Sequence, residues 1–248
     1  MRKLLGYILT PLHYLAFFLW LVIFHPIQWV CFNLFGYKAH KASVDILNFF
    51  LTGTNYILGN TVTFINKQDL PIGRPIIFLA NHQSTNDIPA LIWHLRKYHA
   101  KFISKIELAK GIPSVSYNLR HGGGANIDRK DSRQAIAELL ALGDRMKANN
   151  WSVVIFPEGT RSKDGSVKMF QGGGVGALLK RCPNALLVPI AISNMWKTVQ
   201  YGKFPLGTFI PLRWEVLSPI EPGKTPANDL VLLAENRIKE ALGQPFDK

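Results

Sequence analysis

The chain has 248 residues, with 29 lysines and arginines against 16 aspartates and glutamates, a formal net charge of +13 at pH 7. This length allows one domain with a sizeable core, or one domain with an appendage. So positive a balance favours an anionic partner: nucleic acid, a phosphorylated small molecule or an acidic lipid surface. Two cysteines and no zinc-type spacing of His and Cys exclude a disulfide framework and a structural zinc site.

The N-terminal segment is the most apolar part of the chain. After Arg2 and Lys3, no Asp, Glu, Lys or Arg occurs until Lys38. A secretory signal would have a shorter apolar core and a small-residue cleavage site. We therefore expect residues 1–38 to be a membrane anchor that precedes a catalytic domain at residues 39–248.

The anchor has two arrangements open to it. Pro11 and Pro26 should break the segment into helical pieces of about 14 and 11 residues, each short for a membrane span. Basic residues flank both ends of the segment, and positive flanks prefer the cytoplasmic face. A hairpin embedded in one leaflet keeps both ends there, whereas a single span sends one across, so the pattern favours the hairpin. A buried soluble helix is disfavoured because nothing polar lines either piece.

The remaining pattern alternates between strands and helices. We expect an amphipathic helix within residues 42–59, strands at 61–65, 75–80, 99–104, 151–156, 186–191 and 213–217, and helices at 88–98, 171–180 and 228–242. A further helix should begin at Asp131, which with Gln134 resembles a capping box. This order is typical of an α/β fold, a mixed sheet flanked by helices.

Polar residues follow the strand at 75–80, in the segment 81–87. On a helix His82 and Asp87 would lie about 140° out of phase. With His82 in a loop and Asp87 at the start of the next helix, however, the carboxylate can reach the imidazole. Such a carboxylate fixes the tautomer and leaves the second ring nitrogen free as a base. The alternative is that Asp87 only caps the helix and His82 is an ordinary loop residue.

Two further polar segments, 125–129 and 157–161, also follow strand-like runs. Because strand carboxyl ends gather at one crevice of an open α/β sheet, these segments would bring Arg129 and Arg161 to His82, together with Lys105. Gly159 and Thr160 offer close backbone approach and a hydroxyl. A base, a group of cations and a lipid anchor suggest a reaction at a hydroxyl of a phosphorylated lipid, although a single cation is more often an ordinary surface charge.

Several sequence blocks then resemble the membrane-bound glycerolipid acyltransferase family, most closely its bacterial 1-acylglycerol-3-phosphate acyltransferases. The likeness covers roughly residues 60 to 220. The matching blocks are N-H-x-x-x-x-D at 81–87, K-x-E-L at 105–108, G-x-x-F-I-D-R at 123–129, F-P-E-G-T-R-S at 156–162 and V-P-[IV] at 188–190. Asn126 departs from the family pattern at a usually apolar or aromatic position, which bears on the acceptor or acyl-chain preference.

The resemblance implies a glycerol-3-phosphate acyltransferase-like fold and a definite reaction. A fatty acyl group would pass from acyl-CoA or acyl-acyl carrier protein to the free sn-2 hydroxyl of lysophosphatidic acid, giving phosphatidic acid. No metal or organic cofactor is implied. The enzyme would lie on the inner membrane with its catalytic domain facing the cytoplasm. Glycerol 3-phosphate or another lyso-lipid remains an alternative acceptor.

The resemblance also implies roles for individual residues. His82 would be the general base and Asp87 would orient it, with direct attack on the thioester because no Ser or Cys nucleophile is paired to this base. The phosphate would be bound by Arg161, Lys105 and Arg129, in a pocket shaped by Gly159 and Thr160, while Glu158 would hold the loop or an arginine. The alternative from another class is a non-catalytic basic membrane-binding or nucleic-acid-binding protein. Nucleic acid is disfavoured because the basic residues are spread along the chain and the anchor is uncharged.

Overall fold

The computed structural model describes residues 2–246, and in that range one mixed sheet carries all seven strands, in the order β1-β7-β6-β2-β5-β3-β4. Strands β2 to β6 are mutually parallel, whereas β7 runs antiparallel to β6 and parallel to β1. The predicted mixed α/β sheet is therefore confirmed. The strands are β1 (Thr61–Asn66), β2 (Ile76–Ala80), β3 (Ala100–Lys105), β4 (Ala125–Ile127), β5 (Ser152–Ile155), β6 (Leu186–Ser193) and β7 (Pro211–Val216).

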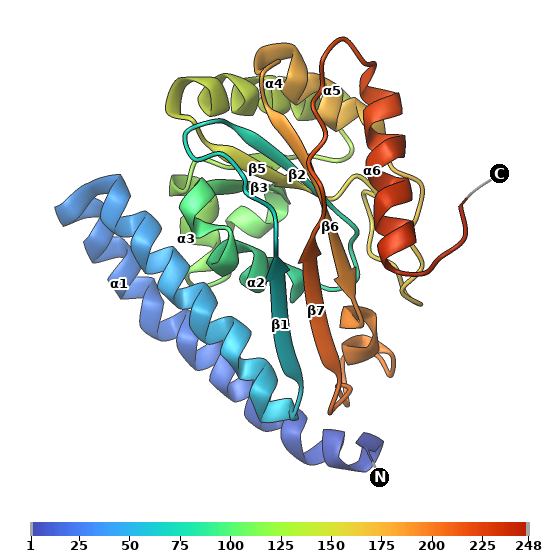
Figure 1. Ribbon diagram of the computed structural model, residues 1–248. Helices are drawn as coiled ribbons and strands as arrows, with labels where there is room; N and C mark the ends of the chain where they lie inside the picture. Colours follow the sequence, from blue (N-terminus) through green and yellow to red (C-terminus); the bar gives the residue numbers. More distant parts are fainter. Residues whose placement is uncertain (1, 247–248) are drawn as a thin grey trace.

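Helices cover both faces of this sheet, as Figure 1 shows. On one face, α4 (Ser132–Asn149), α5 (Gly172–Arg181) and α6 (Ala227–Ala241) pack on alternate strand residues such as Ile77 and Leu79. On the other, α2 (Asp87–His94) packs on Ile76 and Phe78. Because every residue of β2 is buried, its sequence is a continuous apolar run, as in strands covered on both faces.

The start of α4 follows the predicted cap only in part. The Asp131 carboxylate accepts hydrogen bonds from the backbone N–H groups of Arg133 and Gln134. The Gln134 side chain, however, accepts from the N–H of Asp128 rather than returning to Asp131. It also donates to the carbonyl of Asn126. The reciprocal half of a capping box is thus replaced by a contact that fixes the loop after β4.

The N-terminal segment folds as a helical hairpin, α1 (Arg2–Gly53), that lies along the α2 side of the sheet beside α3 (Val115–His121) (Figure 1). The turn is at Gly36, whose φ of 78° lies in the left-handed region that glycine adopts without strain. The first arm covers residues 2–35 and the second residues 37–53, so much of the expected linking helix is the second arm. A short 3-10 turn, Thr54–Leu58, leads into β1.

The prediction that Pro11 and Pro26 break the anchor is wrong, since the first arm is helical through both. A proline within a helix removes one backbone hydrogen bond and bends the axis. Packing between the arms outweighs that loss here: Trp20 stacks on Phe50 with ring centroids 3.9 Å apart. The arms also share an apolar cluster: Leu21, Phe24, Leu47 and Leu51.

The two sides of the hairpin differ in polarity. Its outer side exposes apolar residues along the whole first arm, from Leu4 to Phe35. By length and composition α1 is the one described helix apolar enough to cross a membrane, and only 17% of its most apolar 18-residue window is buried inside the protein. The inner side buries Thr10, His13 and Gln28. The expectation that nothing polar lines the segment is therefore wrong, because a few polar residues are enough to mark an inner face on a long apolar helix.

Candidate active site

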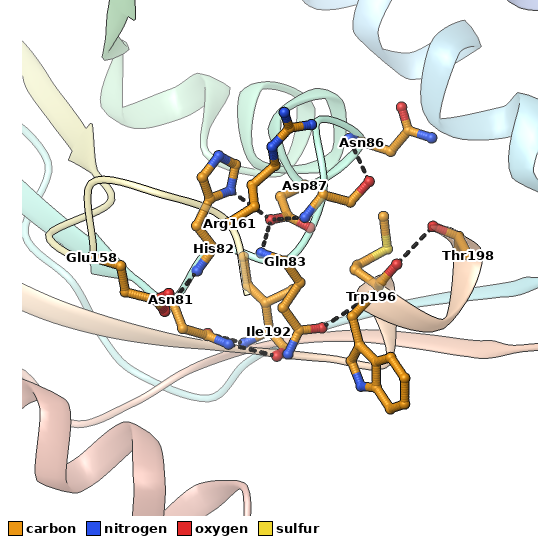
Figure 2. Close-up of polar contacts among 12 residues, drawn as sticks. Asn81, His82, Gln83, Asn86, Asp87, Glu158, Arg161, Ile192, Trp196 and Thr198 are labelled. Atoms are coloured by element: carbon orange, nitrogen blue, oxygen red, sulfur yellow. Dashed lines mark hydrogen bonds and ion pairs between the residues drawn. The ribbon is translucent and has the colours of Figure 1, made fainter. Parts of the chain in front are cut away.

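His82 and Asp87 lie side by side at the carboxyl end of β2. His82 is in the loop after the strand, and Asp87 is the first residue of α2. The imidazole Nδ1 is 2.9 Å from Asp87 Oδ2, a pairing drawn in Figure 2. The same oxygen accepts the backbone N–H groups of Gln83 at 2.7 Å and Ser84 at 2.9 Å. The loop therefore folds around one fully buried carboxylate.

This geometry argues against a capping role alone for Asp87. A cap accepts N–H groups from inside the helix, whereas Asp87 accepts them from residues that precede α2. Its carboxylate on Nδ1 favours the Nδ1–H tautomer and leaves a lone pair on Nε2 of His82. That nitrogen has no hydrogen bond within residues 2–246, and the ring stacks on Phe156 with centroids 4.0 Å apart. The imidazole is thus fixed in orientation, with one nitrogen free to take a proton.

The loop is tied to the neighbouring strands through side chains that the sequence did not single out. The Asn81 amide donates to the carbonyl of Ile192 and accepts its N–H, which joins the end of β2 to β6. Gln83 Oε1 accepts the N–H of Trp196 at 3.3 Å. Figure 2 shows both contacts. Asn81 lies inside the matched motif, directly before His82, and this position is the sequence feature from which its structural role could have been predicted.

Glu158 joins the loop after β5 to the histidine loop. Its Oε1 accepts the backbone N–H of His82 at 3.0 Å, and the carbonyl of His82 accepts the N–H of Ser162 at 2.7 Å. Glu158 thus contacts the histidine loop, and among residues 2–246 no hydrogen bond or ion pair joins it to an arginine. Burial raises the pKa of Glu158 to about 8, against the opposing effects of the His82 N–H and the charge of Lys168.

The three predicted cations do not all reach the histidine. Arg161 lines the same cavity as Ser84, and Figure 2 shows its side chain on the same side of the loop as the His82 ring. Lys105 ends β3, in register with the last residue of β4, and Arg129 lies two residues beyond that strand. Both are exposed and neither lines the cavity. All three share one edge of the sheet, but only Arg161 lies beside the His–Asp pair.

The turn after β5 positions Arg161. Gly159 has a φ of 67°, and its N–H donates to the carbonyl of Phe156. The Lys168 ammonium donates to the Thr160 hydroxyl at 3.0 Å and to the carbonyl of Arg161 at 2.8 Å. Thr160 therefore fixes the turn rather than standing free for a ligand. Lys168 was missed as a site residue because it lies outside the matched block.

A cavity of about 510 Å³ lies between the hairpin and the sheet. Near the His–Asp pair it is bounded by Ser84, Thr85, Asn86 and Arg161. Its walls are mostly apolar side chains of both hairpin arms and α2, among them Phe17, Leu21, Leu47, Leu51, Ile88 and Ile92. The site thus combines a fixed imidazole and an exposed guanidinium with an apolar chamber beneath a helical hairpin.

The mixed α/β sheet thus places a His–Asp pair at its strand ends, next to an apolar chamber under a helical hairpin. The crystal structure of the 1-acyl-sn-glycerophosphate acyltransferase PlsC from Thermotoga maritima has the same fold, with a TM-score of 0.79 and 24% identity over the full length of both chains. The sequence profile described as Acyltransferase matches residues 61–193. The chain belongs to the Acyltransferase family.

Curated proteins with similar sequences are 1-acyl-sn-glycerol-3-phosphate acyltransferases. One from Chlamydomonas reinhardtii is 34% identical over 57% of this chain and 41% of its own length. The enzyme of Saccharomyces cerevisiae is 27% identical over 85% of this chain and 64% of its own. The human beta enzyme is 31% identical over 63% and 56%, respectively. The chain spans between two fifths and two thirds of the length of these three relatives.

Proposed function

We propose that this protein transfers a fatty acyl group from acyl-CoA or acyl-acyl carrier protein to the sn-2 hydroxyl of 1-acylglycerol 3-phosphate, giving phosphatidic acid. The observation that carries the proposal is the His82–Asp87 pair, 2.9 Å apart, with Nε2 of the imidazole unbonded within the described residues. The curated relatives described above are 1-acyl-sn-glycerol-3-phosphate acyltransferases, which supports the same choice of acceptor.

In the proposed mechanism His82 acts as a general base. Its Nε2 takes the proton of the acceptor hydroxyl while the oxygen attacks the thioester carbonyl, and the carbon–sulfur bond breaks as the tetrahedral intermediate collapses. The imidazolium then returns the proton to the departing thiolate. The Asp87 carboxylate stabilises the transient imidazolium. No residue of the site needs to become acylated, because the hydroxyl attacks the donor directly.

The acceptor phosphate is proposed to bind at the exposed cations of the same sheet edge. Arg161 makes the first contact, since it lies beside the His–Asp pair and its guanidinium has no partner within residues 2–246. A guanidinium suits a phosphate because it offers paired donors in a planar fork. Lys105 and Arg129 extend the positive field toward β4. Gly159, Thr160 and Glu158 act on the backbone that presents Arg161 and His82.

The hairpin is proposed to rest in the cytoplasmic leaflet of the inner membrane with its apolar outer side in lipid. Each acyl CH₂ taken from an apolar environment into water costs about 0.8 kcal/mol. An embedded hairpin lets the acceptor reach the site without that cost, while the donor arrives from the cytosol. The chamber beneath the hairpin provides an apolar place for an acyl chain close to His82.

The test is an acyl-transfer assay on the full-length protein in mixed micelles, with lysophosphatidic acid and each donor type. Release of free thiol together with formation of phosphatidic acid is expected. Glycerol 3-phosphate and lyso-lipids without a phosphate serve as competing acceptors, and faster turnover of one of them would replace lysophosphatidic acid in the proposal. Absence of transfer to every acceptor, with membrane binding retained, would favour a non-catalytic membrane-binding protein.

A further inference from the structure

The cavity beneath the hairpin has a polar end. It is formed by Gln28 on the first arm, His40 on the second arm and Lys101 on β3, all of which line the same cavity as Arg161. Gln28 and His40 are 0% exposed and Lys101 is 6% exposed. Burying polar side chains costs free energy unless they form hydrogen bonds, so the partners of these three side chains need to be identified.

The polar atoms of Gln28 and His40 are unsatisfied. Neither amide atom of Gln28 and neither ring nitrogen of His40 has a hydrogen-bond partner within residues 2–246. The His40 ring lies close to the carbonyl of Gln28 and the side chain of Asn118, but neither contact reaches hydrogen-bond geometry. Roughly 90% or more of buried backbone polar groups, and most buried side-chain polar atoms, have a partner. Four exceptions in one cavity indicate that the partner is a polar group that enters it.

Lys101 adds unused donors at the same end. Its ammonium lies 4.2 Å from the ring centroid of Trp151 and 4.8 Å from that of Tyr37, and it donates to the Tyr37 hydroxyl. That hydroxyl also contacts His99 Nε2 at 2.7 Å. An ammonium has three N–H donors, and no carboxylate of the described residues lies within ion-pair distance of Lys101. At least one donor therefore remains for a further acceptor.

The polar end lies toward the far end of α2 from the His–Asp pair. Asp87 at the start of α2 contacts His82, whereas just beyond the end of α2 the carbonyl of Arg96 accepts from Lys41, one turn after Tyr37. The eight residues of α2 span about 12 Å. An acyl chain joined to its thioester near His82 and lying along α2 would bring its distal half to this end of the cavity.

We infer that the polar end of the cavity binds a hydroxyl or other hydrogen-bonding oxygen in the distal half of a fatty acyl chain. The inference rests on the proposed function, because the chain belongs to the donor or the acceptor of acyl transfer. A plain alkyl chain leaves the atoms of Gln28 and His40 unpaired, whereas a hydroxyl both donates and accepts. A site that hydrogen-bonds a substrate oxygen discriminates against the analogue that lacks it.

The experiment compares hydroxylated with plain chains on the full-length protein in mixed micelles. In one arm, hexadecanoyl-CoA competes with the same donor carrying a hydroxyl in its distal half, on a plain acceptor. In the other arm the donor is plain, and the 1-acyl chain of lysophosphatidic acid carries or lacks the hydroxyl. We expect about a tenfold higher kcat/KM for the hydroxylated chain in one arm, and that arm identifies the chain that occupies the cavity.

Variants then locate the preference. Three variants replace a polar group by an apolar one of similar size: Gln28→Met, His40→Phe and Lys101→Met. Each should bring the ratio of kcat/KM for the hydroxylated chain to kcat/KM for the plain chain close to one. A cooperative unfolding transition of each variant in micelles, measured beside that of the wild type, checks that the variant folds. Asn33→Leu is the matched control: it removes an amide from the same helix arm, but Asn33 is exposed, bonds Trp29 and Tyr117, and does not line the cavity. Its ratio should equal that of the wild type.

A ratio near one in both arms for the wild type would overturn the inference and leave the polar end to ordered water. Equal ratios in the wild type and all three cavity variants would overturn it as well. Direct titration of the protein with the two donors measures the same preference without turnover. A binding preference without any transfer to lysophosphatidic acid would refute the proposed function and support the polar end. Transfer to lysophosphatidic acid without a preference for the hydroxylated chain would support the proposed function and refute the inference about the polar end.

Discussion

The two ends of the cavity hold their buried polar side chains in different ways, although Asp87 Oδ1 and Glu158 Oε2 at the catalytic end also lack a hydrogen-bond partner within residues 2–246. At the catalytic end, one oxygen of Asp87 accepts three hydrogen bonds, and the imidazole of His82 is fixed between that carboxylate and Phe156. At the hairpin end, Gln28 and His40 are equally buried but unbonded within residues 2–246. The first end is preorganised before a substrate arrives, as electrostatic catalysis requires. The second end gains its hydrogen bonds only when a ligand supplies them.

The largest expected effect comes from breaking the preorganised end. His82→Ala should lower kcat by roughly 10²–10⁴-fold, the usual contribution of a general base, and leave folding and micelle binding unchanged. Single-turnover transfer to lysophosphatidic acid measures it. His94→Ala, at the other end of α2, controls for the loss of an imidazole. More than a few per cent of wild-type activity in His82→Ala would remove His82 as the base.

Removing the exposed guanidinium should have a smaller effect, and on a different constant. Arg161→Ala loses charge-assisted hydrogen bonds to the phosphate, so the acceptor KM should rise by about 10- to 100-fold. The donor KM should change little. Arg181→Ala is the matched control, since Arg181 ends α5 at the opposite edge of the sheet and, among the described residues, its guanidinium pairs only with Asp144, at 3.8 Å. An acceptor KM equal to that of the wild type would remove Arg161 from the phosphate site.

The same comparison explains what the sequence could predict. His82 and Asp87 are five positions apart between a strand and a helix, so local chain geometry nearly determines that they meet. The parallel strands likewise bring Lys105, Arg129 and Arg161 to one edge. Their final separation, with only Arg161 beside the histidine, depends on side-chain packing that strand order does not contain.

The hairpin end was beyond sequence reasoning for the same physical reason. Gln28, His40 and Lys101 come from two helix arms and a strand, and none has a local partner that a spacing rule detects. The position of the turn at Gly36 was also missed. Sequence rules place helix breaks at Pro11 and Pro26 rather than at a single glycine. Packing between the two arms, however, keeps the helix intact through both prolines. Extensive tertiary packing thus overrides the conformation that local sequence rules predict.

Glu158 provides a stability test at the catalytic end. Its pKa is about 8 in the folded protein against an ordinary value of 4.5. Between these values the folded state binds more protons than the unfolded state, so this group lowers the free energy of unfolding as pH rises from about 4.5 to about 8. Glu158→Gln keeps an acceptor for the His82 N–H but cannot ionise. Chemical unfolding in micelles at pH 5 and pH 8 should show that the free energy of unfolding of the variant, relative to that of the wild type, is higher at pH 8. The same difference in free energy at both pH values would contradict the raised pKa of Glu158.

The smallest expected effect is at the hairpin end and has the opposite sign. Burial lowers the pKa of Lys101 from 10.5 to about 7, so the unfolded state binds more protons between those values. The wild type is then stabilised as pH rises from about 7 to about 10.5. Lys101→Met removes this dependence, and its stability relative to the wild type should be greatest at pH 7 and fall by pH 10.

The stability that the variant gains from removing a buried charge is reduced, because the ammonium's contacts with Tyr37 and Trp151 are lost too. Unfolding curves at the two pH values, compared with those of Glu158→Gln, should therefore slope in opposite directions, and slopes of the same sign would show that the two ends are not electrostatically distinct.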